Sequence, residues 1–408
     1  MDIQQLFAER IGGAAFGTTN AVYKFRKIKD AKAEALENHP GVELLDFGVG
    51  EPDRMAPAPI REALKSAVDK PENRGYADNG IDAFKEAAGE YMAKFFNVND
   101  LDPATEINHS IGSKPALAML PLAFVNPGDT ILATVPGYPI LGTHTQYLGG
   151  KVVDIPLTKA NGFFPELAAI DPAVAREAKL FYVNYPNNPT GAAPTEAFFD
   201  ELIAFAREHN ILIIQDAAYA TLIYDRPRLS ILGRPGGKAV AIELHSMSKS
   251  YNMTGWRLGF AAGSARAIKA FAAVKDNIDS GQFKAIQEAA CAGVADVELS
   301  ESIRRHYETR LRRLAEVLKG NGFDAHMPGG TFYLYVSAPA GAGDVSFKTG
   351  EDASQHLIRE HLISTVPWDD AGPFLRFSAT FESAGKEDDE RVLMELDHRL
   401  KTANLKWD

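Results

Sequence analysis

A single lysine, Lys249, lies among small hydroxyl residues in the stretch LHSMSKSYNMTGWRLG at 244–259. Ser246 and Ser248 precede it, and Arg257 follows it closely. A lysine amine can hold an aldehyde as an imine. Hydroxyl groups together with a cation suit a phosphate dianion. The stretch therefore predicts a site for a ligand that carries both an aldehyde and a phosphate.

Two further apolar runs also lead into reactive side chains. Asn188 follows the run LFYVNYP (180–186), and the run ILIIQDAAY (211–219) contains Asp216 and Tyr219. Ligands of an open parallel sheet gather outside the carboxyl ends of its strands. We therefore expect an amide, a carboxylate and a phenol to meet the lysine at one edge of a sheet.

Pyridoxal phosphate is the common aldehyde cofactor whose needs match this set of side chains. Its ring nitrogen requires a carboxylate partner, which Asp216 can provide. Its ring oxygen requires hydrogen-bond donors, which Asn188 and Tyr219 can provide. A Gly-Ser turn that opens a helical pattern in IGSKPALAML (111–120) offers backbone N–H groups to the phosphate. Tyr138, in PGYP, can lie flat on the ring.

Short apolar runs alternate with longer helical patterns between about residue 40 and residue 285. The segment 195–210 has its apolar residues at helical spacing and begins at Thr195, a suitable cap. This alternation predicts an α/β domain in which helices flank a mostly parallel sheet. We interpret the following runs as its buried strands: 42–50, 128–136, 180–186, 211–219, 239–248 and 257–263.

The C-terminal part of the chain has a different pattern. A long charged helical stretch (297–323) leads into two strand-like runs, GGTFYLYVSAP (329–339) and GPFLRFSATF (372–381), which indicate a smaller α+β domain. We therefore expect three parts in the chain. They are an N-terminal arm over 1–45 that joins the small domain, a large cofactor-binding domain over 46–285, and a small domain over 286–408.

Composition and charge exclude several classes of protein. The chain has 408 residues with 43 basic and 54 acidic side chains, and no long basic stretch, which argues against a nucleic-acid partner. No run reaches the roughly 20 apolar residues that cross a membrane. One cysteine, Cys291, and an N-terminus without a signal-peptide pattern indicate the cytoplasm. The ten histidines show no spacing typical of metal ligands, so we expect no metal site.

Four motifs, taken together, resemble the class I/II aminotransferases, which are fold-type I pyridoxal-phosphate enzymes. The motifs are NNPTG (187–191), DAAY (216–219), SMSKSYNMTGWRLG (246–259) and LRFSA (375–379), and they occur in the order found in the family. The resemblance covers nearly the whole chain. It implies an enzyme that exchanges an amino group between an amino acid and 2-oxoglutarate, and a homodimer with shared active sites.

The resemblance also implies a role for each candidate residue. Lys249 would carry the covalent link to the cofactor, Asp216 would bind the ring nitrogen, and Asn188 and Tyr219 would bind the ring oxygen. The remaining cofactor contacts would come from Gly112, Ser113, Lys114, Ser246, Ser248 and Arg257, from Tyr138 stacking on the ring, and from Tyr76 reaching the phosphate bound by the partner subunit.

On the substrate side, Arg376 would bind the α-carboxylate with a two-pronged contact that lysine cannot imitate. Asn188 and Tyr138 would line the same position. Further stretches are similar to the branch of the family that acts on LL-diaminopimelate in lysine biosynthesis: YKF (23–25), FGVGEPDRMAPAPI (47–60), the lysine of GSK, and DAAYATLI (216–223). On that resemblance Tyr23, Gly48 and Lys114 would contact the substrate.

One segment departs from that branch. Its members usually have an asparagine in a Phe-Asn-Gly context where this chain has Ser280-Gly281-Gln282. We take Gln282 as a candidate for the distal substrate pocket on this ground alone. Aspartate, alanine and aromatic amino acids therefore stay open as alternative donors. A cystathionine-type β-lyase with the same fold and lysine is a second alternative, and a non-catalytic binding protein is disfavoured by the intact set of side chains.

Overall fold

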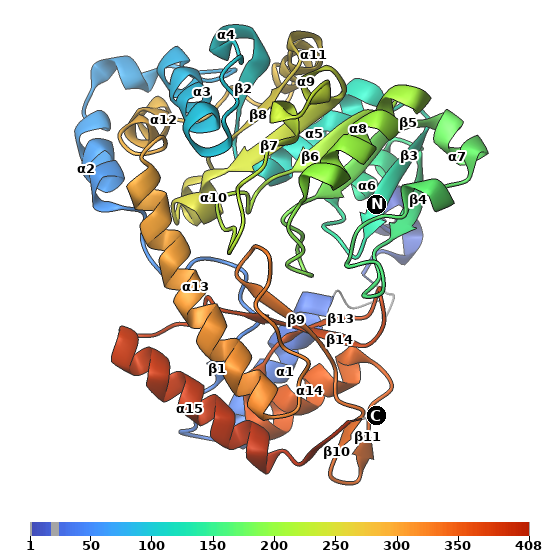
Figure 1. Cartoon of the computed structure of the whole chain (residues 1–408), viewed down its shortest axis with the longest axis vertical. Coiled ribbons are helices and arrows are strands. Elements are labelled where there is room, and N and C mark those ends of the chain that lie inside the picture. The colour runs from blue at the N-terminus through green and yellow to red at the C-terminus, as the bar shows by residue number, and fades with distance from the viewer. Residues whose placement is uncertain (1, 18–23, 408) are drawn as a thin grey trace.

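The computed structural model describes residues 2–17 and 24–407, which form two packed bodies, one above the other in Figure 1. The upper body holds a seven-stranded sheet, and the lower body holds the long helices α13 and α15. The strands are β1 Leu45–Asp46, β2 Ile107–Ser110, β3 Thr130–Val135, β4 Lys151–Pro156, β5 Ala178–Asn184, β6 Leu212–Asp216, β7 Ala241–Ser246, β8 Gly259–Gly263, β9 Tyr333–Ser337, β10 Gly341–Ala342, β11 Val345–Ser346, β12 Ile363–Ser364, β13 Val366–Trp368, β14 Phe374–Ser378 and β15 Leu405–Lys406.

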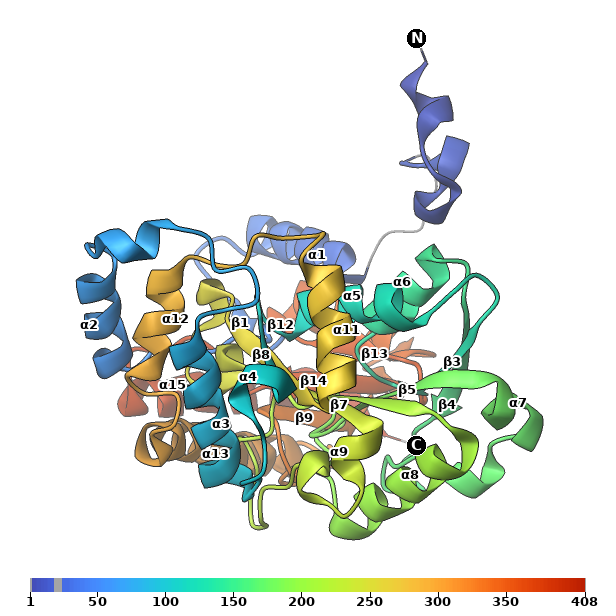
Figure 2. The same cartoon turned by 90° about the horizontal axis from the view of Figure 1, so that it is seen from above.

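The helices cover both faces of the large sheet and build most of the lower body (Figures 1 and 2). They are α1 Lys24–Asn38, α2 Ala58–Ala67, α3 Asp82–Phe96, α4 Pro103–Glu106, α5 Ser113–Phe124, α6 Ile140–Tyr147, α7 Pro172–Glu177, α8 Glu196–His209, α9 Gly237–Val240, α10 Met247–Ser250, α11 Ala265–Lys275, α12 Lys284–Cys291, α13 Val297–Gly320, α14 Gly350–His361 and α15 Lys386–Thr402.

The large sheet has the strand order β2-β8-β7-β6-β5-β3-β4. Strands β7, β6, β5, β3 and β4 run parallel, while β8 runs antiparallel to both of its neighbours. Along β5, Phe181 and Val183 face a core shared with α3 and α8, while Leu180 and Tyr182 face a core shared with α5, α6 and α11. This alternation is the period of two expected of a strand that is covered on both faces. The expected α/β sheet flanked by helices is confirmed.

Helix α8 shows how local sequence sets the connections of this sheet. The Thr195 side chain accepts a hydrogen bond from the N–H of Phe198 at 3.1 Å, which caps the first turn. Asn210 adopts the left-handed conformation that ends the helix. Both ends agree with the helix expected over 195–210.

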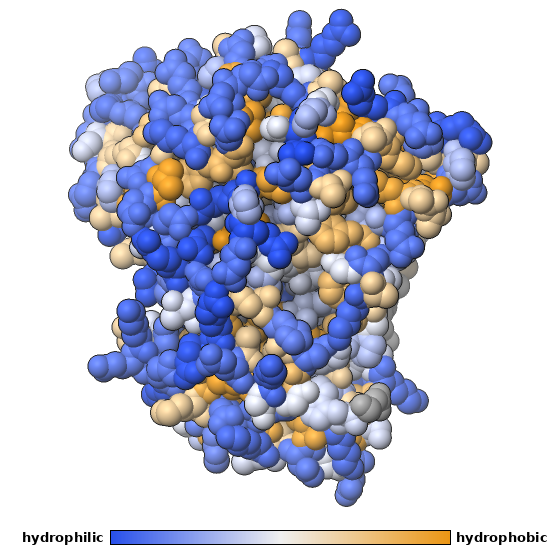
Figure 3. Space-filling model, in the orientation of Figure 1, coloured by the Kyte–Doolittle hydropathy of each residue, from blue (hydrophilic) through white to orange (hydrophobic). Residues whose placement is uncertain are grey.

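The lower body is built around the antiparallel order β13-β14-β9, packed against α13 and α15. Helix α1 packs against α14 through Ile28 and Ala31 on one side and Ile358 on the other. The two bodies are joined along a narrower waist, and hydrophilic side chains predominate on the face of both bodies seen in Figure 3. Within the described residues no helix is long and apolar enough to cross a membrane.

One expected strand of the large sheet is misplaced and two strands were not expected. The run 42–50 gives only β1, which pairs with β12 in the lower body because Leu45 and Phe47 pack in its core. Strand β2 is fully buried but contains Asn108 and His109, so its sequence lacks the apolar pattern of a core strand. Strand β4 lies at the edge of the sheet and is largely exposed, which also weakens the pattern.

The division of the chain into 1–45, 46–285 and 286–408 remains a prediction. Ala289 and Val294 pack in the same core as α3 and α8, so the large body continues for some residues beyond 285. Helix α1, which begins at Lys24, contacts α14 and so packs against the lower body.

Candidate active site

The carboxyl ends of β5, β6 and β7 bring three of the candidate segments together. Asn184 pairs with Asp216 across the two strands, and the Asn184 amide donates to the Asp216 carbonyl at 2.8 Å. The Asn184 side-chain oxygen accepts from the N–H of Asn188 at 2.9 Å. This arrangement fixes the loop that carries Asn188 above the end of β6, as expected for a ligand site in an open sheet.

Lys249 lies on α10, the short helix that begins directly after β7. The Ser246 side chain caps that helix by accepting from the N–H of Ser248 at 3.3 Å. The Lys249 amine donates to the carbonyl of Gly50 at 2.8 Å. Burial lowers the pKa of Lys249 to about 8. The charge of Glu51 opposes this shift, and the smaller effects of Arg257 and Arg376 add to it. The amine is therefore partly neutral, and nucleophilic, near neutral pH.

Asp216 is buried at the end of β6, with only 4% of its surface exposed. Its carboxylate accepts a hydrogen bond from the N–H of Ala218 at 3.2 Å. Burial raises the pKa of Asp216 to about 7, because no cation of the described chain lies against it. A buried carboxylate in this state is stabilised by a bound cation, such as a protonated ring nitrogen.

A cradle for a phosphate lies where the N-terminus of α5 meets the turn after α10. Gly112 begins α5 with a φ of 93°, and a Cβ there would lie 2.5 Å from Nη2 of Arg257. Only glycine allows this close approach. Nη1 of Arg257 donates to the Ser248 hydroxyl at 3.4 Å and to the Thr254 carbonyl at 2.8 Å. A helix N-terminus, a hydroxyl and a guanidinium thus face one point.

Arg376 lies on β14 and points from the lower body toward the ends of the large-sheet strands. Nη1 donates to the Asn188 side-chain oxygen at 2.9 Å, and Nη2 donates to the Gly48 carbonyl at 3.1 Å. Its guanidinium carbon lies 4.0 Å from the centre of the Tyr333 ring. Its Nε is buried and has no hydrogen-bond partner among the described residues. A buried guanidinium with an unused donor suits a carboxylate ligand.

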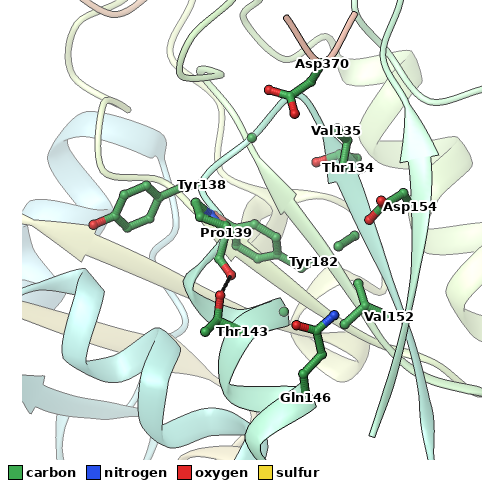
Figure 4. A pocket seen from close by; sticks show the side chains of 13 residues that line it. Thr134, Val135, Tyr138, Pro139, Thr143, Gln146, Val152, Asp154, Tyr182 and Asp370 are labelled. Carbon is green, nitrogen blue, oxygen red and sulfur yellow. Dashed lines mark hydrogen bonds between the residues drawn. The ribbon is translucent and has the colours of Figure 1, made fainter. Parts of the chain in front are cut away.

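Tyr138 follows β3 and lines a cavity of about 180 Å³ together with Tyr182, Asp154 and Asp370. Figure 4 shows its ring turned away from the two carboxylates, on the other side of Pro139. The Tyr138 ring therefore points away from Asp154 and Asp370, and its stacking on a cofactor stays a prediction.

The remaining candidates differ in how closely they approach this centre. The Tyr219 hydroxyl lies among the buried groups, 3.1 Å from that of Tyr333. Lys114 is exposed on the first turn of α5, beside Ser113. Tyr76 is 81% exposed. Tyr23 lies outside the described residues.

Residues 42–385 match the model of the family described as aminotransferase class I and II. The chain belongs to this family. A protein from Methanocaldococcus jannaschii named LL-diaminopimelate aminotransferase is 51% identical to this aminotransferase over 414 residues, covering 100% of this chain and 99% of that protein. A protein of the same name from Methanococcus maripaludis is 52% identical over 404 residues, covering 98% of this chain and 97% of that protein.

Solved structures agree with this family assignment. The substrate-bound BacF structure from Bacillus subtilis superimposes on this aminotransferase with a TM-score of 0.88 at 31% identity, covering 98% of each chain. The small α+β body beside the large sheet is therefore part of a known fold. The recognition of the family from its four motifs is confirmed.

This aminotransferase depends on pyridoxal phosphate, as its family does. The side chains fit that cofactor on three points seen in the structure. A Cβ at Gly112 would enter the phosphate cradle, no cation of the described residues pairs with Asp216, and Lys249 has a lowered pKa. Lys249, Asp216, Asn188 and the cradle would hold the group.

Two residues beside the candidate site make contacts that the sequence did not indicate. Tyr333 links the Tyr219 hydroxyl to the face of Arg376, yet FYLYV reads as an ordinary core strand in the sequence. The Gln282 amide donates to the carbonyls of Trp256 and Arg257, beside the phosphate cradle. Its place in a distal substrate pocket stays a prediction.

Proposed function

We propose that this aminotransferase transfers an amino group from LL-diaminopimelate to 2-oxoglutarate in lysine biosynthesis, in the cytoplasm. Lys249 and Arg376 both contact one short segment, and this arrangement is the observation that supports the type of reaction. Lys249 donates to the Gly50 carbonyl and Arg376 to the Gly48 carbonyl. These two carbonyls belong to residues two apart, which span at most about 7 Å. An amine and a carboxylate receptor held by the same short segment suit the head of an α-amino acid, whose amino group and carboxylate are joined through one carbon.

Each side chain then has a defined task. Bound pyridoxal phosphate supplies the aldehyde and the electron-withdrawing ring. Arg376 binds the α-carboxylate and orients the α-carbon toward Lys249. The lowered pKa of Lys249 lets its Nζ take up and return the α-proton near neutral pH. Asp216 keeps its partner cation protonated in a buried setting.

The choice of donor is supported by the two full-length relatives of that name, which share about half of their residues with this chain. Arg376 cannot make this choice, since every α-amino acid has the same carboxylate. Selection must come from groups that meet the distal ammonium and carboxylate, and a site built for a distal charge rejects analogues that lack it. Gly48, Tyr23 and Lys114 stay candidates for these groups.

A panel of amino donors with 2-oxoglutarate tests the proposal. We expect LL-diaminopimelate to exceed aspartate, alanine, lysine and an aromatic amino acid by at least about a hundredfold in kcat/KM, because buried polar groups would otherwise be left unpaired. Glutamate formation is the measurement, and meso-diaminopimelate is the matched control for stereochemistry. A tenfold advantage for aspartate or an aromatic donor, about 1.4 kcal/mol, would overturn the substrate while leaving the aminotransferase reaction in place.

We also propose a homodimer in which each subunit completes the other's site. Tyr76 is 81% exposed although the sequence gives it a phosphate contact, so its hydroxyl is available to a second subunit. The N-terminal segment before residue 18 extends away from the body (Figure 2) and exposes Ile3, Leu6 and Phe16. Exposed apolar side chains of this kind are typical of contacts between chains.

Mixed subunits test this arrangement. Tyr76→Ala dimers and Lys249→Ala dimers should each be nearly inactive at limiting cofactor, since each lacks one part of every site. After unfolding and refolding together, half of the dimers are mixed and carry one intact site, so activity should recover to about a quarter of the wild-type value. Refolding each variant alone is the control. Failure of the mixture to recover would contradict a shared site.

A further inference from the structure

The segment that departs from the branch pattern, Ser280-Gly281-Gln282, lies directly behind the phosphate cradle. The Gln282 side-chain nitrogen donates to the carbonyls of Trp256 at 2.7 Å and Arg257 at 2.8 Å. Its side-chain oxygen lies 3.0 Å from Nε2 of His109. With both amide protons used by carbonyls, the oxygen must face the ring, so His109 presents an N–H there. All polar groups of this amide are therefore engaged.

The two carbonyls that Gln282 binds belong to a turn with an unusual backbone. Arg257 has a φ of 61° and a ψ of 52°, the left-handed region that non-glycine residues seldom occupy. Such a conformation persists only where surrounding contacts fix it. This conformation directs the guanidinium back over Thr254 and against Gly112. A relaxed backbone would carry the guanidinium away from the cradle.

Gln282 is itself held in place by its neighbours. Its carbonyl accepts from the Gln287 amide at 3.0 Å, and the Gln287 oxygen accepts from the N–H of Ile81 at 2.9 Å. Gly281 has a φ of 82°, and a Cβ there would lie 2.6 Å from the backbone of Ala77. The segment therefore lies flat on the loop that follows Tyr76, which gives the Gln282 amide a rigid base.

We propose that Gln282 is a positioning residue that fixes the Arg257 turn so that its guanidinium meets the cofactor phosphate. The inference rests on the proposed role of Arg257 in phosphate binding. In the described structure Gln282 touches neither Lys249 nor Asp216. The proposal therefore requires that the Gln282 amide affects binding of the phosphate and leaves binding of the ring and aldehyde unchanged.

Binding of two aldehydes to the cofactor-free, full-length protein tests the proposal. Pyridoxal phosphate and pyridoxal share the ring and aldehyde and differ only in the phosphate. For Gln282→Met, which keeps the side-chain length, we expect the dissociation constant of pyridoxal phosphate to rise about tenfold and that of pyridoxal to stay within about twofold. Arg257→Met should raise the first constant by about a hundredfold with the same selectivity.

Ser280→Ala is the matched control, since Ser280 is an exposed neighbour in the same segment whose side chain makes no hydrogen bond to the Arg257 turn among the described residues. It should leave the ratio of the two constants at the wild-type value. An equal weakening of both ligands by Gln282→Met, or no weakening, would overturn the positioning role. If Arg257→Met leaves the ratio unchanged, the proposed phosphate contact of Arg257 fails and the inference fails with it. If wild-type protein binds neither aldehyde, the proposed function itself fails.

Discussion

Replacing Lys249 with alanine should reduce glutamate formation from LL-diaminopimelate and 2-oxoglutarate by at least about 10⁴-fold. The substitution removes both the amine that holds the cofactor and the group that carries the α-proton. Lys249 is partly buried, and among the described residues its amine bonds one backbone carbonyl, that of Gly50, so the fold should tolerate the change. Far-ultraviolet circular dichroism and the melting temperature check that it does.

The matched control for this variant is Lys179→Ala. Lys179 forms a surface ion pair with Asp129 and lies away from the site. Exposed ion pairs contribute roughly 0–1 kcal/mol, so this variant should keep the wild-type rate. A Lys249→Ala enzyme within tenfold of wild type would contradict the role of the lysine, whatever its substrate.

Replacing Asp216 with asparagine should lower kcat about a thousandfold, or roughly 4 kcal/mol, with little loss of bound cofactor. The carboxylate is the charged group placed to keep the ring nitrogen protonated, and asparagine has its shape without its charge. This variant keeps the phosphate cradle at Gly112 and Arg257 and the amine of Lys249. These groups should therefore still retain the cofactor. Rate and cofactor absorbance on the same samples separate the two effects. Equal losses of rate and cofactor would refute the division.

The same variant has a signature that needs no cofactor. The folded pKa of Asp216, about 7, lies above the ordinary value of 3.8 for an aspartate side chain, so the folded state binds more protons between these values. Stability of the cofactor-free protein should therefore fall as pH rises from about 4 to 7. Asp216→Asn removes this part of the pH dependence. A melting temperature with the same slope in wild type and variant would contradict the burial of an unpaired carboxylate.

The sequence predicted the parts of the fold in which apolar pattern and burial coincide. Strands β5 and β6 carry apolar side chains on both faces because both faces are covered, and the reactive groups lie at or just beyond the ends of β5, β6 and β7. The prediction failed where the apolar pattern and burial in the large sheet do not coincide. Leu45 and Phe47 have the pattern of a core strand, yet they pack in the lower body. Buried β2 contains Asn108 and His109, whose polar groups are paired or enclosed by contacts distant in sequence.

The candidate site divides in the same way. Local motifs were enough to find Lys249 and Asp216, because spacing along a strand and its following turn fixes their place. Tyr333 could not be found from local motifs, since its place depends on a contact between β9 and the loop after β6. The contact of Gln282 with Arg257 could not be found either, since a departure from a family pattern does not show which groups the side chain meets.

The most direct test of the account is borohydride reduction of purified protein supplied with pyridoxal phosphate, followed by peptide mass spectrometry. Reduction makes the covalent link between a lysine and the cofactor permanent. The account predicts a single stoichiometric adduct on the peptide that contains Lys249, absent from Lys249→Ala and unaffected in Lys179→Ala. No adduct, or an adduct spread over surface lysines with Lys249 unmodified, would contradict the central claim.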